Sequence, residues 1–176
     1  MIVCLGWGSL IWNTGVLKTH GYWHDSGPKI SVEYLRQSKD GRLTLVIDES
    51  GEKSQVLWSQ MLEKNLELAK ENLRVREGGI HRSDIGVWMK GQEAPGIIQG
   101  LDLWADSIEA SAIIWTNLPP KFEGESHKRP SLDEAILYLD SLEGAPRRLA
   151  EEYIRKTPVQ IKTNYRRKFE EYFGWT

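Results

Sequence analysis

Residues 2–12 read IVCLGWGSLIW, and this stretch decides how the rest of the chain is interpreted. The apolar run at 2–5 predicts a short buried strand, and the two glycines that bracket Trp7 predict that the strand opens into a loop. Gly8 leaves no Cβ in the way, so the backbone amides that follow it are able to point together at an anionic or carbonyl oxygen. The alternative is a tight turn in which the glycines serve only backbone geometry and the tryptophans only fill the core.

Length and charge exclude several classes of protein. The chain has 176 residues, which fits a single domain over 1–176 with a substantial core. It carries 23 Lys and Arg against 25 Asp and Glu, so we expect no general attraction to nucleic acid or to an anionic membrane. A small neutral or zwitterionic molecule is the expected partner, and the oligomeric state is left open.

Cysteine and histidine usage gives no indication of a metal site. The single cysteine, Cys4, lies inside the first apolar run, which predicts an inert core thiol in a reducing compartment. His20 and His24 have i, i+4 spacing, but Gly21 lies between them and no carboxylate is adjacent, so no metal is expected. No targeting pattern and no apolar stretch of membrane-spanning length is present, which predicts a cytoplasmic protein.

Alternating and apolar runs predict a mainly antiparallel sheet. Residues 30–35 and 43–47 flank the turn at 39–42, whose Asp-Gly pair favours a tight hairpin. A third run at 55–59 is expected to continue this series of consecutive antiparallel strands. Two further strands are expected at 85–89 and 112–116.

Helical spacing predicts the remaining elements. A helix is expected over 63–76, a short one over 97–104, and three more after residue 130. The segments 13–28 and 121–129 are expected to be loops, the first of them over the mouth of the site. The predicted fold is therefore α+β: a mixed, mainly antiparallel, barrel-like sheet with flanking helices and a helical C-terminal region.

One carboxylate stands out at a helix end. Glu77 follows the helix expected at 63–76 and precedes Gly78 and Gly79. At this position it meets the negative end of the helix dipole, which disfavours the charged carboxylate, as a general acid/base requires. The alternative is a solvated glutamate beside Arg76.

The order of these motifs resembles the γ-glutamylcyclotransferase-like superfamily. The shared series is a strand, an aromatic-Gly-Ser-Leu loop at 7–10, an antiparallel hairpin, a helix ending in Leu-x-x-x-Glu-Gly at 73–78, and a late strand at 114–117. In this family a Tyr-Gly-Ser-Leu type loop binds the γ-glutamyl group and a glutamate acts as acid/base. The pattern also occurs at 139–144 with Glu143, but chain order favours Glu77.

The resemblance implies roles for five residues. Trp7, Gly8, Ser9 and Leu10 would bind substrate, and Glu77 would be the catalytic acid/base. Trp7 stands where the family has tyrosine, which leaves an indole N–H in place of a hydroxyl.

The implied reaction releases 5-oxoproline from a γ-glutamyl amine or peptide, as a transferase or lyase that needs no metal or organic cofactor. Two alternatives remain. One is a small-molecule-binding member of the same fold without cyclotransferase activity. The other is a protein-interaction module that uses its tryptophans and the basic C-terminal helix.

Overall fold

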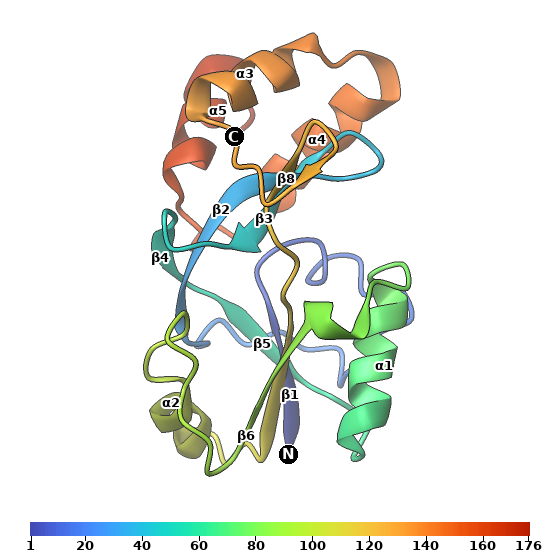
Figure 1. The fold of residues 1–176 in the computed structure, drawn as a ribbon, viewed down its shortest axis with the longest axis vertical. Helices are drawn as coiled ribbons and strands as arrows, with labels where there is room; N and C mark the ends of the chain where they lie inside the picture. The colour runs from blue at the N-terminus through green and yellow to red at the C-terminus, as the bar shows by residue number, and fades with distance from the viewer. The chain divides into compact units, whose positions relative to one another are not determined.

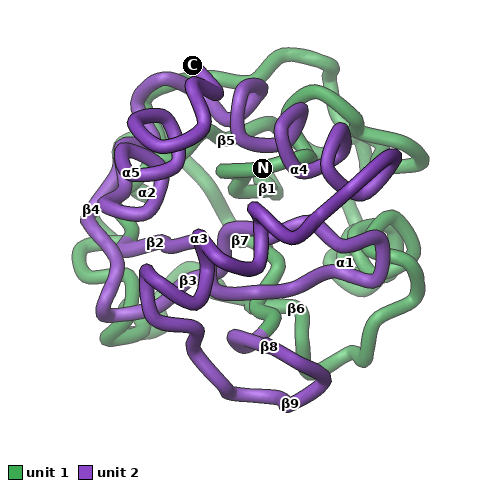
Figure 2. The backbone as a smooth tube through the Cα atoms, turned by 90° about the horizontal axis from the view of Figure 1, so that it is seen from above, with its two compact units in different colours: residues 1–30, 55–118 green, residues 31–54, 119–176 purple.

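The computed structural model describes residues 1–176 and has an α+β fold with two mixed sheets, which confirms the predicted fold class. Neither sheet closes into a barrel. The chain divides into two compact units, drawn in two colours in Figure 2: unit 1 holds residues 1–30 and 55–118, and unit 2 holds residues 31–54 and 119–176. Because each unit is built from two separate stretches of chain, this division does not test the prediction of a single domain.

Unit 1 is built on a four-stranded sheet with the order β5-β1-β7-β6. The two central strands are parallel to each other, and each outer strand is antiparallel to its neighbour. The bounds are β1 Ile2–Gly6, β5 Leu57–Gln60, β6 Ile85–Met89 and β7 Ala112–Thr116. Helix α1 (Leu66–Arg76) follows β5 and runs in the same direction as β1, as Figure 1 shows.

One face of this sheet forms a core with α1. Side chains alternate between the faces of a strand, so Cys4 and Ile114, which are paired in register, point to the same side. They pack with Ala69 and Leu73 of α1, both fully buried. Two consecutive turns of α1 therefore pack on the two central strands, which fixes the position of the helix against the sheet.

Local signals bound α1. The Asn65 side chain caps its N-terminus by accepting the Leu68 N–H. After the C-cap residue Glu77, both Gly78 and Gly79 have positive φ, 82° and 75°, a backbone conformation that few other residues adopt.

Unit 2 contains the predicted hairpin and a cluster of helices. Its sheet has the order β3-β2-β8-β9, with β4 also paired to β2. The strands are β2 Lys29–Gln37, β3 Leu43–Ile47, β4 Glu52–Gln55, β8 Lys121–Phe122 and β9 Glu125–Ser126. The helices are α3 Leu132–Ser141, α4 Gly144–Lys156 and α5 Asn164–Phe173. The capping box of Ser131 and Glu134 that starts α3 is present.

Three local predictions were wrong. The run at 55–59 does not continue the hairpin, because β4 joins β2 while β5 pairs with β1 in the other sheet. The helix expected at 97–104 is α2, Leu101–Ser107, and it begins only after Gly100, whose φ is 73°. The segment 121–129, expected to be a loop, contains the short β8–β9 pair.

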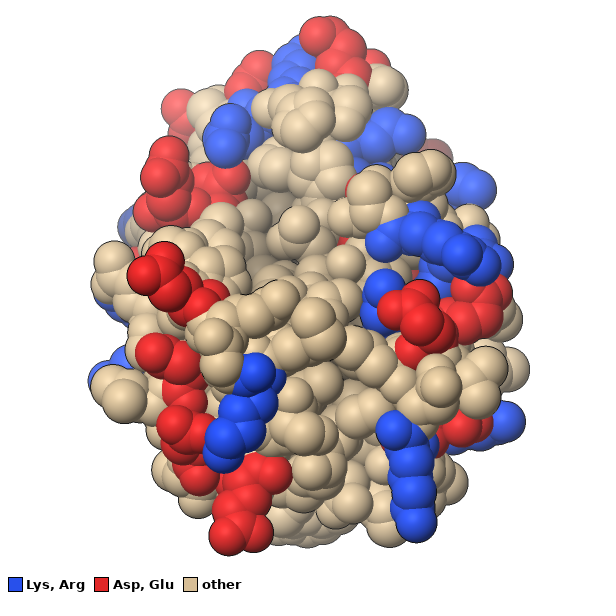
Figure 3. Space-filling view, turned by 60° about the horizontal axis from the view of Figure 1, so that its bottom comes forward, with Lys and Arg blue, Asp and Glu red and all other residues tan.

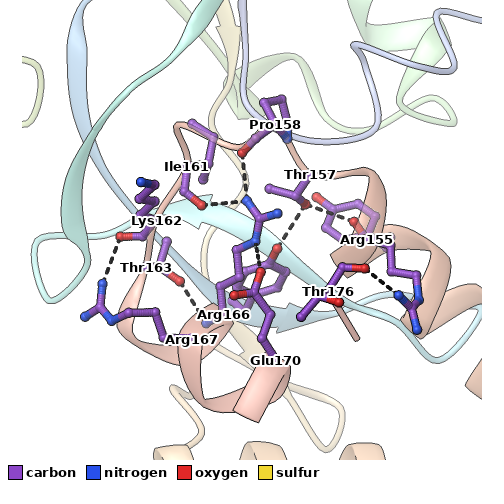
Figure 4. Close-up of polar contacts among 12 residues, drawn as sticks. Arg155, Thr157, Pro158, Ile161, Lys162, Thr163, Arg166, Arg167, Glu170 and Thr176 are labelled. Atoms are coloured by element: carbon purple, nitrogen blue, oxygen red, sulfur yellow. Dashed lines mark hydrogen bonds and ion pairs between the residues drawn. The ribbon is translucent and has the colours of Figure 1, made fainter. Parts of the chain in front are cut away.

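The basic run at 166–168 on α5 is only partly exposed. Arg166 is only 7% exposed. Figure 4 shows its guanidinium donating to the carbonyl oxygens of Pro158 and Ile161, at 2.7 and 2.9 Å, and to the Glu170 carboxylate at 2.8 Å. Arg166 thereby satisfies the carbonyl groups of the turn that leads into α5.

The charged surface is mixed, and no helix has membrane-spanning character. On the face drawn in Figure 3, Lys and Arg side chains lie among Asp and Glu side chains around a broad uncharged centre. Every helix falls short of the length and apolar content that crossing a bilayer requires.

A buried carboxyl in unit 2 makes stability depend on pH. Glu33 is 2% exposed and accepts the backbone N–H groups of Tyr34 and Tyr165, at 2.9 and 3.3 Å. Burial raises the pKa of Glu33 above its ordinary value. A carboxyl with a raised folded-state pKa contributes stability that is fully present below the unfolded-state pKa and is lost as pH rises through the folded-state pKa.

We therefore compare the free energy of unfolding of the wild type with that of Glu33→Gln. The wild-type value minus the variant value should fall as the pH rises from about 4. Urea unfolding at a series of pH values measures this difference. Glu52→Gln is the matched control. The hydrogen-bonded ion pair with Arg167 lowers the pKa of exposed Glu52, so the contribution of Glu52 to stability is lost as pH falls, which is the opposite dependence. A difference for Glu33→Gln that does not change with pH would contradict the assignment.

Candidate functional site

The loop that follows β1 combines buried apolar side chains with free backbone donors. Trp7 and Leu10 are 5% and 6% exposed, so both belong to the core of unit 1, and Ser9 is half-buried between them. The loop closes a turn through Ile11 N–H to the Gly8 carbonyl, at 3.1 Å. The N–H groups of Gly8, Ser9 and Leu10 donate to no atom of the chain, so their hydrogen-bonding capacity is unused within it.

Glu77 lies at the end of α1, and its neighbour Arg76 connects it to this loop. The Arg76 Nη1 lies 2.6 Å from Glu77 Oε1. The Arg76 Nη2 donates to Ser9 Oγ at 3.2 Å and to the Asn13 carbonyl at 2.5 Å. Two of the sequence-predicted residues, Ser9 and Glu77, are thus brought to one guanidinium.

A second α1 side chain holds the loop one turn earlier. Asn72 accepts the Lys18 N–H at 2.6 Å and donates to the Val16 carbonyl at 2.9 Å. Asn72 and Arg76 are four residues apart, so they project from the same face of the helix. Further along, the His20 N–H donates to Gln60 of the edge strand β5. The segment 13–28 is a loop, as predicted, and it is fixed at both α1 and β5.

The direction of the chain explains why these groups meet. The central strands β1 and β7 are parallel, so their carboxyl ends lie at the same edge of the sheet. Helix α1 runs the same way as β1 and ends at that edge, as Figure 1 shows. The edge therefore receives the loop after Gly6, the end of β7 at Thr116, and Glu77. Ligand sites in sheets with parallel strands commonly lie at the carboxyl ends of those strands.

Three buried polar atoms on this side of unit 1 have no hydrogen-bond partner in the chain: Trp23 Nε1, Ser59 Oγ and Thr116 Oγ1. The strand registers place Ser59 beside Cys4 and Thr116 two residues beyond Ile114, so both point to the face that packs on α1. Almost all buried polar groups in native proteins are hydrogen-bonded, so these three groups have unused capacity to bind a polar partner.

Gly6 allows Trp23 to reach this face. A Cβ on Gly6 would lie 2.7 Å from the Trp23 ring, a distance that real Cβ atoms do not tolerate. The glycine of the first motif is therefore needed for close approach of an aromatic ring, rather than only for a turn. Trp23 also packs on the core that includes Leu10 and Leu17.

Cys4 lies buried near the charged pair of Arg76 and Glu77. It is fully buried, and burial raises the pKa of its thiol far above the ordinary value, with a further increase from nearby Glu77. The expectation of an inert core thiol therefore agrees with its surroundings. In the whole chain, no three His, Cys, Asp or Glu side chains gather as a metal site would require.

Sequence reasoning did not identify several of these groups. Arg76 entered only as a neighbour of Glu77, Thr116 only as part of the late strand at 114–117, and Ser59 and Trp23 were not proposed as site residues. The facing of Ser59 and Thr116 follows from strand register, and the place of Trp23 follows from its packing over Gly6, neither of which a sequence pattern shows. Glu143, the other glutamate in the repeated pattern, is exposed and lies in unit 2, whereas the predicted loop residues and Glu77 are in unit 1.

Comparison with known proteins adds no assignment. No protein-family model, no curated protein and no solved structure matches this chain. The resemblance to the γ-glutamylcyclotransferase-like superfamily therefore stays a prediction based on the residues themselves.

The orphaned hydroxyl of Ser59 predicts an unusual response to mutation. Ser59→Ala should leave the free energy of unfolding unchanged or raise it by about 1 kcal/mol, because it removes a buried polar group without breaking a hydrogen bond. Thr157→Val is the control: the Thr157 hydroxyl accepts from Tyr34 and donates to the Tyr153 carbonyl, both at 2.9 Å, so its loss should cost about 1–3 kcal/mol. Chemical denaturation measures both. A comparable loss for Ser59→Ala would show that its hydroxyl has a partner within the folded chain.

Proposed function

We propose that the chain is a γ-glutamylcyclotransferase-like enzyme that releases 5-oxoproline from a γ-glutamyl amine or peptide. The observation that carries the proposal is the Arg76 guanidinium, which joins Glu77 to Ser9 within 2.6 and 3.2 Å. Arg76 thus contacts both the loop to which the family resemblance assigns substrate binding and the glutamate to which it assigns acid/base catalysis. The proposed ligand is a zwitterion, in keeping with the formal net charge of −2.

The proposed chemistry needs one acid/base group and a set of fixed donors. After the substrate α-ammonium has released one proton to solvent, the neutral amine attacks the γ-amide carbonyl carbon and a five-membered ring closes. Glu77 accepts the proton that the attacking nitrogen gives up. It then delivers this proton to the leaving nitrogen as the old C–N bond breaks.

The loop supplies stabilisation of the oxyanion that forms on the γ-carbonyl oxygen. The free N–H groups of Gly8, Ser9 and Leu10 are suitable donors, and each preorganised donor of this kind is worth about 3 kcal/mol in known enzymes. The nucleophile belongs to the substrate and is separated from its target carbon by only three carbons, so proximity lowers the barrier without a metal or an organic cofactor.

Buried polar groups on the sheet face that packs on α1 are proposed to contact the polar remainder of the substrate. Ser59 and Thr116 each offer a hydroxyl that is able to donate and to accept, and Trp23 offers an indole N–H. Trp7 is buried in the core, so in this proposal the residue that replaces the family tyrosine shapes the wall of the site and does not supply a reacting group.

The direct test measures 5-oxoproline released from glutathione, γ-glutamyl dipeptides and γ-glutamylamines. We expect release from at least one of them, and Glu77→Gln should lower kcat by about 10²-fold or more, because the variant cannot accept a proton. Absence of release from the whole panel would refute the cyclotransferase proposal.

Two control variants separate a catalytic role from a change in charge. Glu143→Gln removes the other candidate glutamate, and Glu71→Gln removes an α1 carboxylate that pairs with Arg74 at 2.7 Å. Both should keep wild-type kcat. If Glu143→Gln were inactive and Glu77→Gln active, the acid/base assignment would be wrong.

A further inference from the structure

Arg76 and Glu77 place a cation and an anion side by side in a mostly buried position. Their side chains are 10% and 16% exposed, and their charged atoms are 2.6 Å apart. The α-carbon of a free amino acid carries the same two charges in the same proximity. An α-amino-acid head group is therefore complementary to this pair, with its carboxylate facing the guanidinium and its ammonium facing the carboxylate.

The guanidinium is anchored in a way that permits such an exchange. Its Nη2 is held by Ser9 Oγ and the Asn13 carbonyl, both neutral acceptors of the loop. Its Nη1 is held only by Glu77. A ligand carboxylate that takes the place of Glu77 at Nη1 leaves the two loop contacts of Nη2 intact, so the loop already holds the arginine in position for an anion.

We propose that Arg76 binds the α-carboxylate of the substrate, and that in the free protein Glu77 occupies this binding position. The exchange releases Glu77 Oε1 toward the α-amine, so the acid/base becomes available only when a carboxylate has arrived. The inference rests on the proposed function for the identity of the reacting γ-amide. Recognition of the head group is a binding property and is measured without turnover.

The arrangement also determines which molecules are rejected. A simple carboxylic acid would separate the pair and leave Glu77 without a partner, and a simple amine would leave Arg76 without one. An unpaired charge in a mostly buried position is costly, so each single-charge ligand pays a cost that the zwitterion avoids. The site is thus selective for molecules that carry both charges on one carbon.

Three non-reactive probes with the same apolar propyl group test this. L-norvaline carries both charges, pentanoate only the carboxylate and n-butylamine only the ammonium, and none has a γ-carbonyl. Each is titrated into the ¹⁵N-labelled full chain, and amide shifts are followed by NMR. We expect norvaline to shift the resonances of Ser9 and Glu77 and to bind at least about tenfold more tightly than the other two.

Arg76→Gln should weaken norvaline binding at least about tenfold. Arg76→Lys retains the charge without the guanidinium fork, so its loss should be smaller, and it serves as the second variant if Arg76→Gln does not fold. Arg74→Gln is the matched control, because Arg74 lies on the same helical turn, and its hydrogen bonds go to Glu71 and the Ile80 carbonyl and not to the loop at 7–13. It should bind norvaline as the wild type does.

The outcomes separate the two proposals. Pentanoate or butylamine binding as tightly as norvaline, unchanged binding by Arg76→Gln, or no binding of norvaline at all would overturn the role of Arg76. Charge-dependent norvaline binding without 5-oxoproline release from any γ-glutamyl compound would retain this inference and refute the cyclotransferase reaction. If 5-oxoproline is released and Arg76→Gln leaves KM unchanged, the cyclotransferase reaction is retained and the role of Arg76 is refuted.

Discussion

The parallel pairing of β1 with β7 is the constraint on which unit 1 depends. Parallel neighbours bring two carboxyl ends to one edge of the sheet, and the chain must return between them through other elements. It does so through β5, α1 and β6, so the helix that follows β5 runs alongside β1 and ends at the same edge. The apolar contact of Leu73 with the sheet then sets the position of the last helical turn, where Arg76 and Glu77 lie.

Electrostatics at this helix end balance two opposing preferences. A carboxylate at the C-terminus of a helix is disfavoured by the helix dipole, whereas a guanidinium there is favoured. Adjacent residues Arg76 and Glu77 supply both, and the arginine also provides hydrogen bonds to Ser9 and the Asn13 carbonyl. The same side chain therefore compensates the glutamate and fixes the loop, which couples local stability to the geometry of the candidate site.

Much of the local structure could be predicted because its signals are short in range. Alternation predicted the hairpin of β2 and β3, and the Ser131 capping box predicted the start of α3. Predictions failed where a partner distant in sequence decided the outcome. The run at 55–59 was expected to continue the hairpin, but β5 pairs with β1 in the other sheet, and no pattern within the run contains information about that partner.

The sequence by itself determined the strand-to-loop motif at 2–10, the helix that ends at Glu77, and the elements of the α+β fold, because periodicity and caps act within a few residues. Only the tertiary structure decided that β5 leaves the hairpin to pair with β1, that Trp23 lies over Gly6, and that Arg76 joins Ser9 to Glu77. The physical reason is that strand register and the filling of a core depend on contacts between segments far apart in the chain, which no local pattern encodes.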